Sequence, residues 1–130
     1  MRLSVLTPAK PFVEVEVAEV YCPGSEGRLG VLPDHITFLA SLGTGEVTYR
    51  TESGSASLVI SGGIIEVVDN EVTILADRAV TPGDVDVSAA RQELAQAEED
   101  LGSLDAMSDE YAAAQSNREW ALARVAAAEK

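Results

Sequence analysis

The stretch SGGIIEVVDNEVTILAD, residues 61–77, predicts a β-hairpin and sets the fold class of the first part of the chain. Its two apolar runs, residues 64–68 and 72–76, have the length and the β-branched composition of ordinary strands. The dipeptide Asp69-Asn70 between them favours the positive φ angles of a tight two-residue turn. We therefore expect an antiparallel sheet built around this hairpin.

Short runs of strand-forming residues continue towards the N-terminus. In FVEVEV, residues 12–17, valines alternate with glutamates, which is typical of a half-buried strand. Further runs are GRLGVL, ITFLAS, EVTYRT and ASLVIS, at residues 27–32, 36–41, 46–51 and 56–61. Their spacing of about 8–12 residues, with turn residues such as SGS at 53–55 between them, predicts a β-sandwich or flattened barrel.

Three segments of this first part interrupt the alternation. In VEVAEVYC the apolar positions change from odd to even numbers near Ala18 and Glu19, which predicts a β-bulge there. The glycine-containing segments GTGE, residues 43–46, and SGG, residues 61–63, lack the lysine and the following helix of a phosphate-binding loop. We interpret both as β-turns or as a kink within a strand.

The composition changes after TPGD, residues 81–84. Residues 85–130 are rich in alanine and contain no proline and one glycine, Gly102, which favours helices. The segment LGSLDAMSD, residues 101–109, is interpreted as a break between two helices, with Gly102 as the C-cap of the first. The candidate N-caps are Asp84, Asp86 or Ser88 for the first helix and Ser108 or Asp109 for the second.

Two stripes at helical spacing predict an antiparallel helical hairpin. The first stripe consists of Ala90, Leu94, Ala97 and Leu101, and the second of Tyr111, Ala114, Arg118, Ala121 and Val125, with Leu122 beside it. Because alanines bury little area, about 1 kcal/mol or less each, we expect weak packing, weakened further by Arg118. The predicted organisation is an all-β sandwich over residues 1–83 and a helical hairpin over residues 84–130.

Charge, cysteine and histidine content exclude several classes of protein. The chain has 22 acidic residues against 9 Lys and Arg, a net charge of −13, which disfavours nucleic-acid binding. Cys22 is the only cysteine and His35 the only histidine, so neither an intrachain disulfide nor a Cys/His metal site is expected. No apolar run approaches the roughly 18 residues that span a bilayer, and MRLSVLTPAK lacks the apolar core of a signal peptide. We expect a soluble chain without direct membrane insertion.

Catalytic chemistry has no visible arrangement in the sequence. Asp34 and His35 are adjacent, and neighbouring residues of a strand or loop point in different directions. No nucleophile or second carboxylate is linked to them by sequence, so a structural or interface role is favoured. Trp120, the only tryptophan, is interpreted as a packing residue. The sequence predicts a non-catalytic protein that acts by binding.

Three ordered segments resemble one known family. GSEGRLGVLPDHITFLASLGTGEV at residues 24–47, ISGGIIEVVDNEVTILADRAV at residues 60–80 and the alanine-rich tail are similar to the ε subunit of bacterial and chloroplast F-type ATP synthases. The resemblance covers essentially the whole chain. It implies a β-sandwich followed by a helical hairpin, in a non-catalytic central-stalk rotor subunit that couples c-ring rotation through γ to ATP synthesis or hydrolysis.

The resemblance also implies partners and candidate contact residues. The sandwich would contact γ and the polar loops of the c-ring through Glu26, Arg28 and His35, although Arg28 stands where the family often has an acidic residue. The hairpin would contact the α and β subunits and regulate hydrolysis, with Arg118 and Arg124 as candidates. The expected location is the cytoplasmic face of the bacterial inner membrane, with the chloroplast thylakoid as the alternative.

The charge of the tail and a departure from a family motif bear on regulation. Residues 84–130 hold 11 acids and 4 bases, a charge of −7. The resemblance implies that inhibitory helices of the family tend to use basic residues against an acidic segment of the β subunit. Some relatives bind ATP through an Asp, two further residues and then Arg-Ala. Here Asp86 is retained, but Ala89 stands at the arginine position, and Arg91 lies about 200° further around the helix. We expect no cofactor, and keep ATP binding at Asp86 and Arg91, in a free-standing nucleotide-sensing module, as the alternative.

Overall fold

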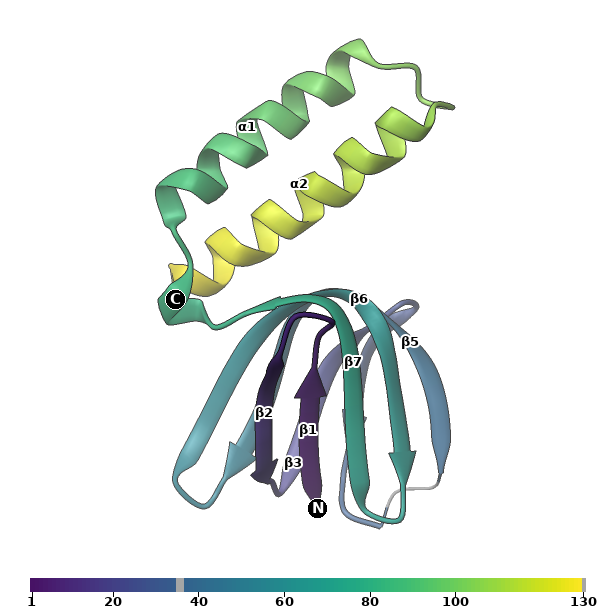
Figure 1. Cartoon of the computed structure of the whole chain (residues 1–130), viewed down its shortest axis with the longest axis vertical. Coiled ribbons are helices and arrows are strands. Elements are labelled where there is room, and N and C mark those ends of the chain that lie inside the picture. Colours follow the sequence, from purple (N-terminus) through teal and green to yellow (C-terminus); the bar gives the residue numbers. More distant parts are fainter. Residues whose placement is uncertain (35–36, 130) are drawn as a thin grey trace. The chain divides into compact units, whose positions relative to one another are not determined.

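The structure is a computed structural model that describes residues 1–34 and 37–129. It consists of two compact units, residues 1–80 and residues 81–130, and each unit is described by itself. The first unit is a β-sandwich and the second a pair of α-helices (Figure 1). The predicted fold class is confirmed.

The described residues of the first unit form a single seven-stranded sheet in the order β2-β1-β7-β6-β5-β3-β4. Neighbouring strands are antiparallel except for β1 and β7, which are parallel. The strand bounds are β1 Arg2–Leu6, β2 Pro11–Glu16, β3 Glu19–Gly24, β4 Gly27–Val31, β5 Phe38–Thr51, β6 Gly54–Val68 and β7 Glu71–Val80.

The long strands β5 and β6 fold this sheet into a sandwich. They stay in one register from Phe38 opposite Val67 to Thr51 opposite Gly54, and they curve over as an arch in Figure 1. In both strands the core-facing positions switch between even and odd numbers halfway along. The core-facing residues of β5 are Ala40 and Leu42 and then Val47 and Tyr49, and those of β6 are Leu58 and Ile60 and then Ile65 and Val67. One strand pair therefore supplies both layers of the core.

Glycines make this change of side possible. Gly62 and Gly63 have φ angles of 70° and 125°, which other residues adopt only with strain. A Cβ atom on Gly63 would lie 2.1 Å from the carbonyl oxygen of Leu75 in β7, so the neighbouring backbone occupies the space of a side chain. The SGG segment is a kink inside a continuous strand, as one of our interpretations proposed, and not a turn.

Two of the sequence-based predictions for the sheet were wrong. Residues 38–41 and 46–51, predicted as separate strands, are both parts of β5, and residues 56–61 and 63–68 are both parts of β6, because the glycines bend these strands without breaking their hydrogen-bonded register. The predicted bulge near Ala18 is a break between β2 and β3, which pair with different neighbours, β1 and β5. The Asp69-Asn70 turn is confirmed, with φ angles of 49° and 63°.

The second unit contains a short 3-10 helix, η1 Pro82–Asp84, and the helices α1 Val87–Ser103 and α2 Asp109–Ala128. The side chain of Asp86 caps α1 by accepting a hydrogen bond from the Ala89 N–H, and Ser108 caps α2 through the Tyr111 N–H. Gly102 lies within α1 and is not its C-cap, because the helix continues to Ser103.

The helices pack on alanines, and the buried face of α2 contains Ala114 and Ala121 of the predicted stripe but not Arg118. Ala90 and Ala97 of α1 are buried, and α2 buries Ala114, Trp120, Ala121 and Ala127. Arg118 is exposed, and so is Leu122. The interpretation of Arg118 as part of the packed stripe was therefore wrong, because the buried face is turned towards the large ring of Trp120. The packing role of Trp120 is confirmed.

Candidate functional site

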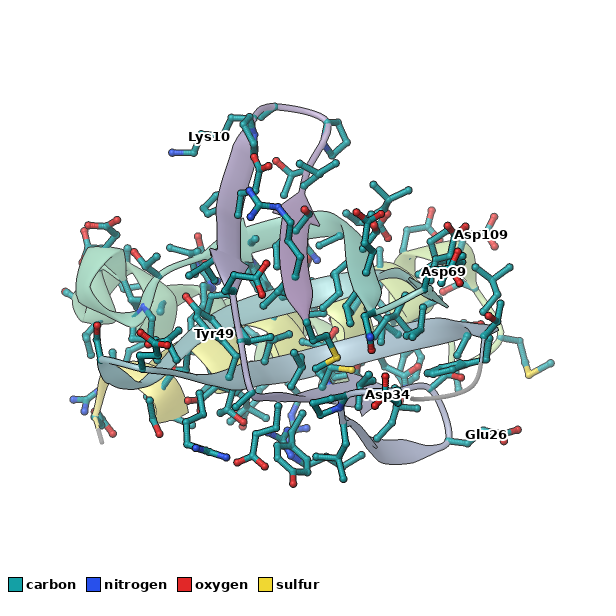
Figure 2. All side chains as sticks on the ribbon, turned by 90° about the horizontal axis from the view of Figure 1, so that it is seen from below. Lys10, Glu26, Asp34, Tyr49, Asp69 and Asp109 are labelled. Atoms are coloured by element: carbon teal, nitrogen blue, oxygen red, sulfur yellow. The ribbon has the colours of Figure 1, made fainter. Side chains whose placement is uncertain are left out.

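The β3–β4 turn carries the first predicted contact residue. Glu26 is exposed at this turn, and Gly27 follows with a φ of 134° that favours glycine. The Ser25 N–H donates to the Ser41 carbonyl, which ties the turn to β5. In Figure 2 the side chain of Glu26 points outward from the edge of the sandwich. A carboxylate in this position is accessible to a partner.

Arg28 is held against the sheet, although it stays exposed. Its guanidinium donates to the Glu46 carbonyl oxygen at 2.9 Å and to the Thr48 hydroxyl at 3.1 Å, both on β5. These bonds direct the positive charge across β3 and away from the turn. The structure therefore does not bring Arg28 and Glu26 together as one ionic contact, and the third predicted residue, His35, lies outside the described residues.

A second loop, residues 32–34, is bonded to the β6–β7 turn. The Asp34 N–H donates to the Asn70 side-chain oxygen at 2.6 Å, and the Asn70 side-chain nitrogen donates to the Asp34 carboxylate at 3.1 Å. The Asn70 carbonyl also accepts the Arg2 N–H of β1 at 2.9 Å. Asn70 thus joins three separate segments of the chain.

An apolar stripe crosses the outer face of the sheet. We use the name outer stripe for the side chains of Leu6, Leu39, Ile64 and Leu75. Ile64 lies directly opposite Leu75, and Leu75 opposite Leu6, while Leu39 is diagonal to Ile64. Leu39, Ile64 and Leu75 are 65%, 41% and 45% exposed, respectively. Contiguous exposed apolar side chains on adjacent strands make this stripe a candidate contact surface.

The basic residues of the helical unit are mostly engaged. Arg124 of α2 forms an ion pair with Glu93 of α1, lies 5.1 Å from the centre of the Trp120 ring and donates to the Trp120 carbonyl. Its side chain is only 15% exposed. Arg91 of α1 forms an ion pair with Glu129. The inter-helix ion pairs therefore join the start of α1 to the end of α2.

We expect Arg124→Gln to loosen the helix pair, because it removes an ion pair and a cation–π contact together worth about 1–2 kcal/mol. The fluorescence of Trp120 should shift to longer wavelength, and the helices should unfold at a lower urea concentration. Arg118→Gln is the matched control, because Arg118 is exposed on the same helix. Equal effects of the two substitutions would contradict this role of Arg124.

The predicted nucleotide-binding residues are not arranged as one site. The Asp86 carboxylate is used as the helix cap, and the Arg91 guanidinium is paired with Glu129. An open depression on α1 is lined by Val87, Ser88, Arg91, Gln92 and Ala95, and Asp86 does not contribute to it. ATP binding through both residues would require each to give up its present partner.

Cys22 is fully buried in the sandwich core, and burial raises the pKa of its thiol to about 11, against a smaller opposite effect of Arg28. The thiolate is the reactive form, so the native chain should resist maleimide at about pH 8 and react rapidly in denaturant. Mass spectrometry of labelled chain measures this. Rapid labelling under native conditions would show that the sandwich opens readily.

Among residues 1–34 and 37–129, no group of three or more His, Cys, Asp or Glu side chains is placed to hold a metal ion. In the same part of the chain, neither helix has the length and apolar character needed to cross a membrane.

Sequence reasoning missed the outer stripe and the Asn70–Asp34 pair. The stripe was detectable in part, because the run GIIEVV carries apolar residues on both faces of a strand, whereas a strand with one solvated face alternates. The pairing of two polar residues 36 positions apart leaves no comparable signal in a single sequence.

Comparisons with known proteins agree with this architecture. Residues 1–82 match the family model described as ATP synthase, Delta/Epsilon chain, beta-sandwich domain. The chain is 38% identical to the ATP synthase epsilon chain of Nitratidesulfovibrio vulgaris, over 96% of this chain and 92% of that protein. It is 39% identical to the ATP synthase epsilon chain of Syntrophobacter fumaroxidans, over 100% of this chain and 96% of that protein.

Two solved structures are similar to the whole chain. A chain in the Euglena gracilis mitochondrial ATP synthase, in a structure of OSCP, F1 and the c-ring, matches with a TM-score of 0.83 and 26% identity, covering 96% of this chain and 79% of that one. A chain of the Tetrahymena thermophila mitochondrial ATP synthase central stalk and c-ring shares the fold, with a TM-score of 0.70 and 19% identity, covering 98% of this chain and 95% of that one.

Proposed function

The chain belongs to the ATP synthase delta/epsilon family, and from this premise we propose that its β-sandwich binds the γ subunit through the outer stripe. The chain is a non-catalytic subunit of the central stalk in a membrane-associated ATP synthase complex. The resemblance found in the sequence is confirmed at this level.

The observation that supports γ binding is the outer stripe. Four strands contribute to it, and its members adjoin one another across the sheet. A stable interface needs an apolar centre that excludes water. The exposed side chains of Leu39, Ile64 and Leu75 meet this requirement better than the charged β3–β4 turn does. A rotor subunit must transmit torque without detaching, which favours a broad rigid sheet face over a loop.

The c-ring contact is assigned to the β3–β4 turn. Glu26 is exposed there, and Figure 2 shows it pointing outward. Arg28 remains a candidate, since its guanidinium is exposed although bonded to β5. Exposed charges steer association and select partners more than they add affinity. The side chain at position 26 should therefore face a basic polar loop of the ring.

The helical unit is assigned a regulatory contact with the α and β subunits. Arg118 is its exposed basic residue on α2, whereas Arg124 and Arg91 are paired with glutamates. The acidity of residues 84–130 argues for weak inhibition of ATP hydrolysis. We assign no ATP site to this unit, because Asp86 and Arg91 already have partners within it.

We propose the cytoplasmic face of the bacterial inner membrane as the location of the complex. The relatives named above, from Nitratidesulfovibrio vulgaris and Syntrophobacter fumaroxidans, support a bacterial source over the thylakoid alternative. Coupling of ring rotation to ATP synthesis or hydrolysis would follow from simultaneous contact with γ and the ring.

The test is co-purification of the tagged chain with γ and with the α3β3γ assembly, followed by ATPase rates. Full-length chain and a chain ending at Gly83 should both bind, since the sandwich carries the contact. If only the full-length chain lowers the rate of ATP hydrolysis, the result supports a regulatory role of the helical unit. Equal ATPase rates with the two chains would contradict that role. Failure of the full-length chain to bind γ would refute the proposed function.

A further inference from the structure

Two hydrogen bonds join Asn70 to Asp34. The amide of Asn70 accepts through its oxygen and donates through its nitrogen, while Asp34 donates its backbone N–H and accepts with its carboxylate. Two bonds between the same two residues fix orientation as well as distance. The bond to the carboxylate is charge-assisted and therefore stronger than a neutral one.

Asn70 is also suited to its backbone position. Its φ is 63° and that of Asp34 is 62°, a left-handed conformation that Asn, Asp and Gly adopt at little cost. Its carbonyl oxygen binds the Arg2 N–H independently of the side chain. The turn and its link to β1 can thus be kept while the side-chain pair is removed.

The loop held by this pair lies at the end of the sheet that carries the outer stripe. Asn70 joins β6 and β7, which contain Ile64 and Leu75, and the chain after Asp34 leads into β5, which contains Leu39. Leu32 in the same loop is 51% exposed and Val68, just before the turn, is 36% exposed. Val68 thus adds an exposed apolar side chain to the face of β6 that carries Ile64, and Leu32 adds one in the loop bonded to this turn.

We propose that Asn70 is a positioning residue, which holds residues 32–34 in place before binding and so completes the surface that docks on γ. This inference rests on the proposed function. A loop that is ordered in the free chain loses no conformational entropy when the partner binds. The expected consequence is higher affinity for γ, without a contact between Asn70 itself and the partner.

The experiment measures the Kd for γ with four full-length variants. Asn70→Gly keeps the positive φ and removes both side-chain bonds, so affinity should fall about tenfold. Asn70→Asp sets two carboxylates against each other and should weaken binding by at least about tenfold. Asp34→Asn combined with Asn70→Asp restores an amide–carboxylate pair in the opposite sense, so its Kd should return to within about threefold of wild type.

Asp69→Asn is the matched control, because it removes one negative charge from the same turn without touching the pair. Its Kd should equal that of the wild type. Hydrogen exchange of the Asp34 backbone amide can be measured by NMR in the free chain. The exchange rate should rise in Asn70→Gly and return to the slow rate of the wild type in the double variant.

The outcomes separate this inference from the proposed function. A wild-type chain that does not bind γ refutes the proposed function, and the amide exchange still tests the pair by itself. Wild-type affinity in Asn70→Gly, or no rescue in the double variant, overturns the inference. So does a fall in melting temperature with an unchanged Kd, since that would make the pair merely structural.

Discussion

Gly63→Ala is expected to destabilise the β-sandwich strongly. The φ of 125° strains any residue with a side chain, at a cost of about 1–3 kcal/mol, and the new Cβ would also lie 2.1 Å from the Leu75 carbonyl oxygen. The backbone of β7 would have to move where it pairs with β6. We expect a total loss of about 3–5 kcal/mol, a large fraction of the stability of such a domain.

Gly54→Ala is the control for this substitution. Gly54 has a φ of 126°, but nothing lies within 4 Å of the position of its Cβ. The strain is therefore matched and the collision is removed, so the loss should be about 1–3 kcal/mol. Urea unfolding followed by circular dichroism and by Cys22 labelling measures both variants. Equal losses would contradict the account of the kink at Gly63.

Leu75→Glu is expected to weaken binding of γ by about 100-fold, or about 2.7 kcal/mol. The side chain lies in the middle of the outer stripe, between Ile64 and Leu6. A glutamate there would have to lose its hydration inside the interface without a partner for its charge. Titration calorimetry with γ measures the effect.

The fold of Leu75→Glu should be preserved, because the side chain is 45% exposed in the free chain. Met107→Glu is the control: Met107 is 92% exposed in the loop between the helices and lies outside the proposed contact. Its affinity for γ should equal that of the wild type. If Leu75→Glu binds γ with wild-type affinity, the outer stripe is not part of the interface with γ.

Features with a local cause were predictable from the sequence. The Asp69-Asn70 turn follows from the backbone preferences of those two residues, and the caps Asp86 and Ser108 from side chains that reach the next turn of helix. The family resemblance rested on ordered motifs and correctly indicated a central-stalk subunit.

Features that depend on distant neighbours were not predictable. A glycine pair is compatible with a turn or a kink, and the choice at Gly62 and Gly63 depends on β5 and β7 holding their register with β6. The buried face of α2 was predicted only in part, because alanines on several faces give a weak stripe. Ala114 and Ala121 are buried as predicted, but Trp120 and Ala127 are buried beside them. His35, a predicted contact residue, stays a prediction.

The most direct test of the central claim is a titration of purified γ with the wild-type chain. A central-stalk subunit that docks through a broad apolar face should form a one-to-one complex with a Kd below about 1 µM. Hydrogen exchange of the complex should show protection of β5, β6 and β7 around the outer stripe. Absence of saturable binding, or protection confined to α1 and α2, would contradict the account.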